Sequence, residues 1–335
     1  LLDFGAYASA SGEARAIGDF VRELAAQNAG EIDAHWPKVL RRVAGYNLDV
    51  FHNQNPRPYT DDGSVNLAHL LVGSEGTLAL IVEARLKLLP LPAQHGSLRA
   101  LYTDVSSAAA AVARIMAQPM TPSMLEFMDR ACIRLAREVG GADIPDAGAL
   151  LMIEIDGDAA TLPHALETIA SAAYGDGLIA LDDAPDDASR DRLWAARKSL
   201  SPALRTMATG KINEDVVVPV SQIPALVAGV EALAAEYDLP IVAFGHAGNG
   251  NLHVNILFDP ADAAQSGRAQ AALPRLFALT LSLDGTLSGE HGIGVAKREF
   301  MRHAFDPATL DLMRTVKAAF DPDGILNPGK VLPAG

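Results

Sequence analysis

The stretch PIVAFGHAGNGNLHVNILF, residues 240–258, contains two apolar runs separated by a turn rich in glycine and asparagine. Apolar runs of this length with Val, Ile and Phe, interrupted by such turn residues, are typical of a β-hairpin. We therefore predict strands at 240–246 and 251–258. Because side chains alternate between the two faces of a strand, one polar face is expected on the second strand, formed by Asn251, His253 and Asn255.

Two strand–helix–strand units precede this hairpin, and each predicts one half of an α+β layer. The strands are expected at 97–104, 124–129, 149–156 and 177–183, and the helices at 107–118 and 162–174. This order is typical of a ferredoxin-like fold. Three further elements lead to the hairpin: a helix at 187–207, a strand at 213–219 and a helix at 221–237.

The outer parts of the chain follow other patterns. Residues 11–27 have helical apolar spacing with Ser11 as the N-cap. Residues 76–90 alternate between apolar and charged side chains, which predicts a half-buried strand. The proline-containing segment 89–96 then predicts a domain boundary. Near the end, Asp306 is the predicted N-cap and Pro307 the predicted first residue of a helix that ends near Phe320.

Composition limits the class of protein. A chain of 335 residues is longer than one ordinary core requires, so we expect two domains. The net charge of −14 argues against a nucleic-acid partner, whose phosphates demand a basic face. The single Cys132 fits a reducing compartment, so we expect a cytoplasmic location, with peripheral attachment to the inner membrane as the alternative. No stretch approaches the roughly 18–20 continuous apolar residues of a membrane span.

A second histidine-containing stretch, SGEHGIG at 288–294, places Glu290 next to His291 between glycines. Two imidazoles and a carboxylate, from His246, His253 and Glu290, would suit a divalent ion, with zinc or manganese favoured. His291 would remain as a proton acceptor, since an unperturbed imidazole has a pKa of about 6.5. The alternatives are a solvent-exposed hairpin face and a helix-capping glutamate beside a solvated histidine.

Two basic residues and one turn are further candidates for ligand binding. Arg197 and Lys211 are candidate anion binders, and the guanidinium of Arg197 could hold a carboxylate through two parallel hydrogen bonds. A solvated helix charge is the alternative for Arg197. The turn GSEGT, residues 73–77, could present backbone N–H groups to a ligand, although a turn before a strand also explains it. It is neither a Walker loop nor a GxGxxG fingerprint.

Several motifs accompany these residues in order along the chain. They are RRVAGYNLD (41–49), LLVGSEGTLALIVEARLKLLP (70–90), LWAARK (193–198), KINEDVVVP (211–219), GHAGNGNLHVN (245–255), SGEHGIG and DPDGILNPGK (321–330). Together they resemble the flavin-dependent D-2-hydroxy acid dehydrogenases. This branch of the vanillyl-alcohol-oxidase-type FAD-linked oxidases includes D-lactate, D-2-hydroxyglutarate and glycolate dehydrogenases. The resemblance covers nearly the whole chain from Arg41 onward.

The resemblance implies roles for single residues. It implies a metal site formed by His246, His253 and Glu290. It makes His291 the general base, and it places Arg197 at the substrate carboxylate and Lys211 at a second anion contact. The residues that it implies beside FAD are Gly45, Tyr46, Asn47, Gly73, Ser74, Glu75, Gly76, Thr77, Ile81, Asn255 and Asn327.

The same resemblance implies three domains. Residues 1–93 would be the C-terminal part of the FAD-binding domain, without the half that carries the pyrophosphate-binding loop. Residues 95–300 would be the substrate or cap domain with the metal site. Residues 301–335 would be a helical tail that packs back on the FAD domain. We therefore expect the chain to be the back portion of a longer protein.

The implied activity is FAD-dependent, metal-assisted oxidation of a D-2-hydroxy acid, D-lactate-like, to the 2-oxo acid. The electron acceptor would be a quinone, an electron-transfer flavoprotein, a cytochrome or an iron–sulfur module, and a homodimer is a candidate assembly. Two alternatives remain from the residues themselves. The same ligand set could activate water in a metal-dependent hydrolase, or the chain could be an inactive fragment that lacks the pyrophosphate loop.

Overall fold

The computed structural model describes residues 12–52, 66–138, 143–183 and 203–334, and between them positions 188, 190, 191, 194, 195, 197 and 200. The chain divides into two compact units. The first unit combines Leu1–Lys87 with Asp284–Gly335, and the second is Leu88–Leu283.

A seven-stranded sheet forms the centre of the second unit, with the order β4-β1-β3-β2-β6-β7-β5. Its strands are β1 (Gln94–Tyr102), β2 (Met124–Asp129), β3 (Ala149–Gly157), β4 (Leu178–Asp183), β5 (Gly210–Val217), β6 (Ile241–His246) and β7 (Asn251–Phe258). All neighbouring pairs are antiparallel. The predicted hairpin is confirmed, and its second strand has the bounds that the alternation predicted.

The first four strands form the predicted ferredoxin-like layer. Their order is β4-β1-β3-β2, with α3 (Val105–Met116) between β1 and β2 and α5 (Leu162–Ala173) between β3 and β4. β6, β7 and β5 extend this layer on the β2 side, so the hairpin joins the layer edge to edge through the β2–β6 pair. The α+β class predicted from the sequence is therefore confirmed.

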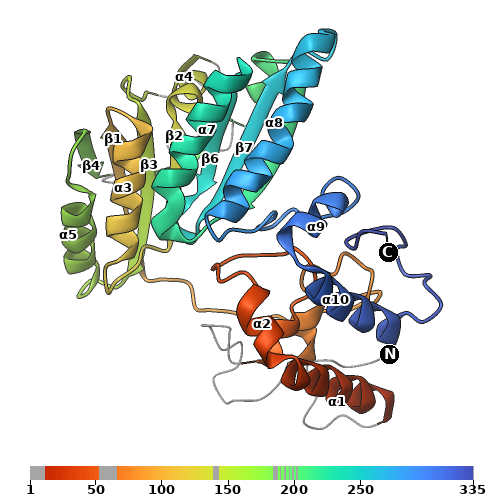
Figure 1. Ribbon diagram of the computed structural model, residues 1–335. Helices are drawn as coiled ribbons and strands as arrows, with labels where there is room; N and C mark the ends of the chain where they lie inside the picture. The colour runs from red at the N-terminus through yellow and green to blue at the C-terminus, as the bar shows by residue number, and fades with distance from the viewer. Residues whose placement is uncertain are drawn as a thin grey trace. The chain divides into compact units, whose positions relative to one another are not determined.

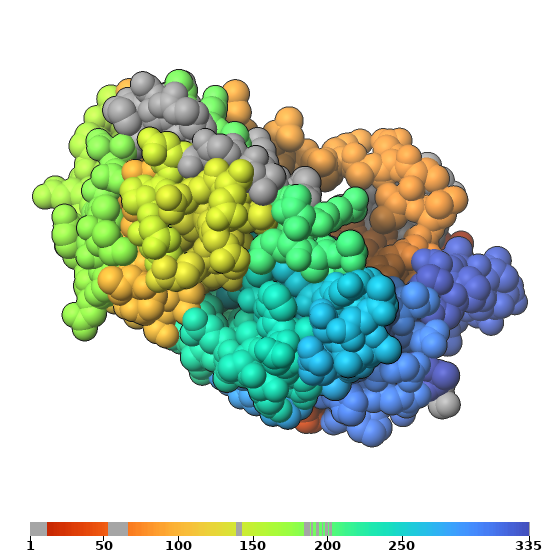
Figure 2. All heavy atoms as spheres, turned by 90° about the horizontal axis from the view of Figure 1, so that it is seen from above, coloured from red at the N-terminus to blue at the C-terminus, as the bar shows by residue number. Residues whose placement is uncertain are grey.

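Helices cover the two faces of this sheet differently. Figure 1 shows α3, α5, α7 (Ile223–Tyr237) and α8 (Ala263–Ser282) over one face, and α7 and α8 adjoin at the surface in Figure 2 as well. The other face carries α4 (Arg130–Glu138), whose buried residues join an apolar cluster with side chains of β1, β2, β3 and β6. Each fully buried Leu or Ile contributes about 1.5–3 kcal/mol to the stability of the fold. The apolar cluster therefore stabilises this face of the sheet next to its polar residues.

In the part that the structure describes, the regular structure of the first unit is helical. Its helices are α1 (Gly12–Gln27), α2 (Ala29–His35), α9 (Met301–Ala304) and α10 (Pro307–Phe320). α10 packs against α1 and α2 (Figure 1). Asp306 accepts a hydrogen bond from the Thr309 backbone N–H at 2.7 Å, which confirms the predicted N-cap and start of this helix. The predicted helix at 11–27 is confirmed from Gly12 onward, and Ser11 lies outside the described residues.

The strand predicted at 76–90 is wrong. This segment pairs with no strand among the described residues. Leu80, Val82 and Leu86 are 81%, 66% and 76% exposed, although the alternation assigned them to a buried face. Alternation determines only which side chains share a face, whereas a strand also needs a neighbouring backbone to complete its hydrogen bonds.

Two other expectations concern the long helix and the membrane. The helix predicted at 187–207 is only partly described, and it gives way to a 3₁₀ turn at Leu204–Thr206. Within the described ranges, no helix has the length and apolar character that crossing a bilayer requires.

Candidate functional site

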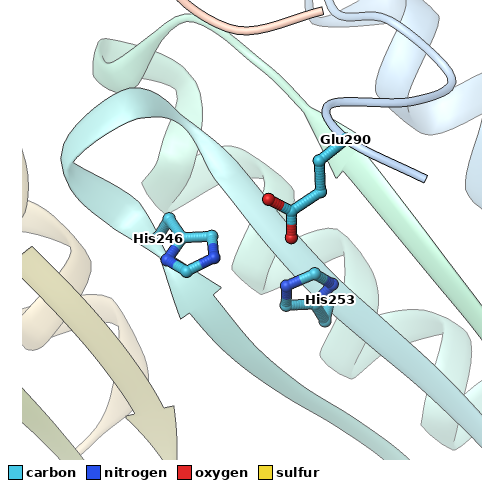
Figure 3. Close-up of side chains that lie close together, drawn as sticks. All are labelled: His246, His253 and Glu290. Atoms are coloured by element: carbon cyan, nitrogen blue, oxygen red, sulfur yellow. The ribbon is translucent and has the colours of Figure 1, made fainter. Parts of the chain in front are cut away.

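The β6–β7 hairpin brings two histidines together. His246 ends β6, and His253 lies on β7 opposite Phe244. The ring centroids of His246 and His253 are 5.5 Å apart in an edge-on arrangement. Figure 3 shows these two imidazoles on neighbouring strands. The sequence prediction that the hairpin places both imidazoles in one site is therefore consistent with the geometry of the second unit.

The turn between the strands depends on glycine at one position. Gly250 has φ +83°, and a Cβ atom there would lie 1.9 Å from the Val218 carbonyl oxygen. Val218 directly follows β5, and its backbone N–H donates a hydrogen bond to the Gly250 carbonyl at 3.1 Å. The turn therefore packs directly on the neighbouring backbone, which fixes the spacing of the two histidines.

The polar face predicted on β7 is buried. Asn251, His253 and Asn255 lie on one face and are nearly inaccessible to solvent, so the alternative of a solvent-exposed face does not hold. The amide nitrogens donate to strand carbonyls, from Asn251 to Val216 at 3.2 Å and from Asn255 to Val242 at 3.4 Å. The two amide oxygens are buried and accept no hydrogen bond from the described residues.

A buried carboxylate that the sequence analysis missed lies on the same face. Glu126 of β2 is 1% exposed. Its Oε2 accepts a hydrogen bond from Arg197 Nε at 2.7 Å, and its Oε1 contacts Nδ1 of His246. Burial alone would raise the pKa of the Glu126 carboxyl, but the hydrogen bond from His246 and the charge of Arg197 outweigh burial, so the pKa lies below its ordinary value.

Arg197 is held on a second side by an aromatic ring. Its guanidinium carbon lies 4.6 Å from the centroid of Phe244, a typical cation–π distance. Arg197 is mostly buried, which excludes the solvated helix charge considered above. Nearby, the indole N–H of Trp194 donates a hydrogen bond to the carboxylate of Glu154 on β3, which continues the polar row towards that strand.

β5 adds acidic and basic groups to this face. Asp215 is fully buried and lies opposite His253 in the register. Lys211 lies on the same side of β5 but opposite Leu257, about 13 Å further along the strand than Asp215. Burial and the nearby charge of Arg205 lower the pKa of Lys211. The structure therefore does not bring Lys211 next to the histidines, and its anion-binding role stays a prediction.

In the first unit, the SGEHGIG loop is held by two other motifs. Glu75 of GSEGT accepts hydrogen bonds from the backbone N–H of Ile293 at 2.6 Å and of Gly294 at 2.8 Å. Arg41 pairs with the carboxylate of Glu290 at 2.8 Å. These contacts enclose the segment that carries Glu290 and His291, so the loop has a defined backbone path.

Most of the side chains predicted beside FAD form hydrogen bonds with other residues of the first unit. Tyr46 Oη lies 2.7 Å from Thr77 Oγ1, and Asn47 donates to the Val72 carbonyl at 3.0 Å. Asn327 donates to the Glu75 carbonyl at 2.6 Å. These groups stabilise the turn itself.

The parts of the predicted FAD segment that face outward are backbone and apolar. At Gly76 a Cβ atom would meet nothing within 4 Å, and Ile81 is 56% exposed. An open glycine backbone and an exposed apolar side chain can each contact a flat aromatic ring, and the place of Gly76 and Ile81 beside FAD stays a prediction. Gly45 differs, because its φ of +83° would strain any other residue, and a Cβ there would also lie 2.7 Å from the Met313 side chain, so the local backbone favours glycine.

The chain thus combines a ferredoxin-like layer with a polar, histidine-containing sheet face. Residues 91–331 match the model of the FAD linked oxidases, C-terminal domain. The chain belongs to this family. The membership does not favour the metal-dependent hydrolase.

Named relatives agree with this assignment. The chain is 36% identical over 272 residues to glycolate oxidase subunit GlcD of Bacillus subtilis, covering 81% of this chain and 58% of that protein. It is 36% identical to glycolate oxidase subunit GlcD of Escherichia coli K12, covering 82% and 55%. It is 31% identical to a probable mitochondrial D-lactate dehydrogenase of Danio rerio, covering 82% and 56%. The chain therefore spans little more than half the length of these relatives.

Solved structures are similar in fold. p-Cresol methylhydroxylase with substrate bound has a TM-score of 0.56 at 14% identity, with 72% of this chain and 53% of that chain covered. An alkyldihydroxyacetonephosphate synthase has a TM-score of 0.52 at 17% identity, with 79% and 49% covered. At these identities the similarity concerns the fold alone, and it agrees with the predicted vanillyl-alcohol-oxidase type.

Proposed function

We propose that this chain is the catalytic C-terminal portion of a flavin-dependent dehydrogenase that oxidises a D-2-hydroxy acid to the 2-oxo acid. The observation that carries the proposal is the arrangement on the sheet face of the second unit. There a mostly buried arginine, suited to a carboxylate, is tied through Glu126 to His246, which lies beside His253. Relatives named as glycolate oxidase subunits and D-lactate dehydrogenases support a 2-hydroxy acid as substrate.

In this proposal two nonprotein groups complete the site. His246, His253 and Glu290 would hold a divalent ion, because two imidazoles and a carboxylate form a typical set for zinc or manganese. The ion would supply Lewis acidity that favours loss of the substrate hydroxyl proton. The flavin, beside Gly76 and Ile81, would supply the acceptor for the hydride from the α-carbon.

The side chains of the protein perform the remaining tasks. Arg197 binds the substrate carboxylate and fixes its orientation. His291 accepts the hydroxyl proton at an imidazole nitrogen. Glu75 and Arg41 hold the loop that carries His291 and Glu290.

Other assignments remain part of the proposal. Residues 1–93 would belong to the FAD domain, 95–300 to the substrate domain and 301–335 to the tail. Asn255, Asn327 and Lys211 keep the roles that the resemblance implies. The electron acceptor, a homodimer and the cytoplasmic location are equally proposals.

The test is a substrate screen of the complete natural protein loaded with FAD. D-lactate, L-lactate, glycolate and D-2-hydroxyglutarate are supplied with a dye acceptor, with and without a chelator. We expect turnover of at least one D-2-hydroxy acid or glycolate, and its loss with chelator. No turnover of any of these by a flavin-loaded protein would contradict the proposal.

Two variants assign the roles. His291→Ala should lower kcat by about 10²–10⁴-fold, the typical contribution of a general base. Arg197→Ala should lower kcat/KM, because the carboxylate loses its partner. His164→Ala is the matched control, since His164 is an exposed histidine on α5. Turnover of His291→Ala equal to that of His164→Ala would remove His291 from the mechanism.

A further inference from the structure

Glu126 is a charged group in a place where charge is costly. It is the only acidic residue in the strand segment MLEF of β2, and it is 1% exposed. A buried carboxylate is tolerated when it is paired and hydrogen-bonded. Here each oxygen has its own partner: Oε2 contacts Arg197 Nε at 2.7 Å, and Oε1 contacts His246 Nδ1.

We infer that Glu126 is a positioning residue that fixes two groups at once, the metal-binding nitrogen of His246 and the carboxylate-binding edge of Arg197. The inference rests on the proposed function, which assigns His246 to the ion and Arg197 to the substrate. Glu126 would touch neither ion nor substrate, and it would act through these two side chains.

The contact with His246 selects one tautomer of the imidazole. An ionised carboxylate can only accept hydrogen bonds, so Nδ1 must carry the proton. The lone pair is then on Nε2, the nitrogen on the far side of the ring from Glu126. A histidine ligand commonly has its second nitrogen bound to a carboxylate in this way, which fixes the ring and increases its basicity.

The contact with Arg197 selects one edge of the guanidinium. Nε is occupied by Glu126, and Phe244 lies against the guanidinium at 4.6 Å. The contact with Glu126 leaves the two Nη groups of Arg197 out. Two such N–H donors can bind both oxygens of a planar carboxylate. Because one carboxylate holds both groups, the separation between the ion and the substrate carboxylate is set by a single side chain.

The first test measures metal binding without activity. Flavin-free protein is titrated with Zn²⁺ against a competing chelator, for the wild type, Glu126→Gln and Glu154→Gln. Glu154 is the matched control, because it is a nearly buried carboxylate on the same sheet face that pairs with Trp194. We expect Glu126→Gln to weaken Zn²⁺ binding about 10–100-fold, the typical effect of losing such a partner, and Glu154→Gln to leave it unchanged.

The second test reads the tautomer directly. Nitrogen-15 NMR of histidine-labelled, metal-free protein at a pH where the imidazole is neutral should show His246 protonated at Nδ1. In Glu126→Gln, whose amide can also donate, the signal should shift towards the mixed or Nε2-protonated form. The wild-type spectrum alone tests the inference if the variant does not fold, because an Nε2-protonated wild-type His246 would overturn it.

Kinetics of the complete protein separate this inference from the proposed function. Glu126→Gln should raise KM for the 2-hydroxy acid as well as lower metal occupancy, and excess metal should restore occupancy but not KM. A folded Glu126→Gln protein with unchanged Zn²⁺ affinity and an unchanged tautomer would overturn the inference. Weakened Zn²⁺ binding and an altered tautomer would uphold it even if no 2-hydroxy acid is turned over, an outcome that would reject only the proposed function.

Discussion

At the scale of single residues, Glu75 shows how one side chain can organise a loop. Its backbone has φ +53°, a conformation uncommon outside glycine. Its carboxylate accepts two backbone N–H groups of the SGEHGIG loop. Gly292 lies close by, and a Cβ atom there would approach Glu75 Oε1 to 2.7 Å. The side chain therefore needs both its own strained backbone and the glycine in front of it.

Glu75→Ala should destabilise the first unit. The substitution leaves the N–H groups of Ile293 and Gly294 without their acceptor, at a cost of about 1–3 kcal/mol. Thermal unfolding followed by circular dichroism measures the change. Glu83→Ala is the matched control, because Glu83 is an exposed glutamate in the same segment. Equal melting temperatures for the two variants would show that the loop does not depend on Glu75.

How much of the site the sequence predicts depends on how local the signal is. The shared face of Asn251, His253 and Asn255 follows from alternation within one strand, and it is confirmed. Glu126 could not be found in this way, because its partners are 71 and 120 residues away. The available signal was weak: one carboxylate within the apolar run 124–128 of β2, which must find a partner when it is buried.

At the scale of elements, the hairpin depends on its glycine turn. Gly250→Ala should destabilise the second unit by about 1–3 kcal/mol, the usual cost of a strained backbone, because the new Cβ would lie 1.9 Å from the Val218 carbonyl oxygen. Urea unfolding measures the change in midpoint. Gly267→Ala is the control, since Gly267 lies within α8 with nothing within 4 Å of its Cβ position.

The control variant Gly267→Ala also has a predicted effect on stability. Alanine in a helix interior is favoured over glycine by about 0.8–1.0 kcal/mol, so Gly267→Ala should be neutral or stabilising. A Gly250→Ala protein as stable as Gly267→Ala would mean that the turn can move without loss, and the fixed spacing of the two histidines would then need another cause.

Elements were predictable where the pattern and the neighbours agree. Each strand of the second unit has the apolar pattern and also a hydrogen-bonded neighbouring strand on one side or on both. The segment 76–90 has the alternation without a partner among the described residues, and the prediction failed there. α4 was missed because it follows β2 without a turn, and its start is determined by Asp129, whose carboxylate accepts the Cys132 backbone N–H at 2.8 Å.

At the scale of the whole molecule, the division into units has one local signal, the proline-containing segment 89–96 next to the start of the second unit at Leu88. The first unit contains both ends of the chain, with α10 packed on α1 and α2. Composition predicts two domains from length alone, but it does not predict that residues after Leu283 return to the first unit. Each unit nevertheless contains one large buried tyrosine, Tyr46 in the first and Tyr102 in the second.

These two tyrosines predict how the stability of both units depends on alkaline pH. Burial raises the pKa of Tyr46 to about 12, and the charges of Glu75 and Asp321 add to this effect. Burial likewise raises the pKa of Tyr102 to about 12. In the unfolded chain a tyrosine has a pKa of about 10. Between these values the unfolded state holds fewer protons than the folded state, so stability falls as the pH rises.

The stabilisation is therefore complete below about pH 10 and is lost as the pH rises towards 12, with a loss of about 2–3 kcal/mol for each tyrosine. Urea unfolding at pH 9 and pH 11 should show a smaller decline for Tyr46→Phe in the first unit and for Tyr102→Phe in the second, because phenylalanine cannot ionise in the unfolded chain. Tyr174→Phe, which replaces an exposed tyrosine, should follow the wild type. A decline in Tyr46→Phe and Tyr102→Phe as steep as that of Tyr174→Phe would assign the alkaline sensitivity to other groups.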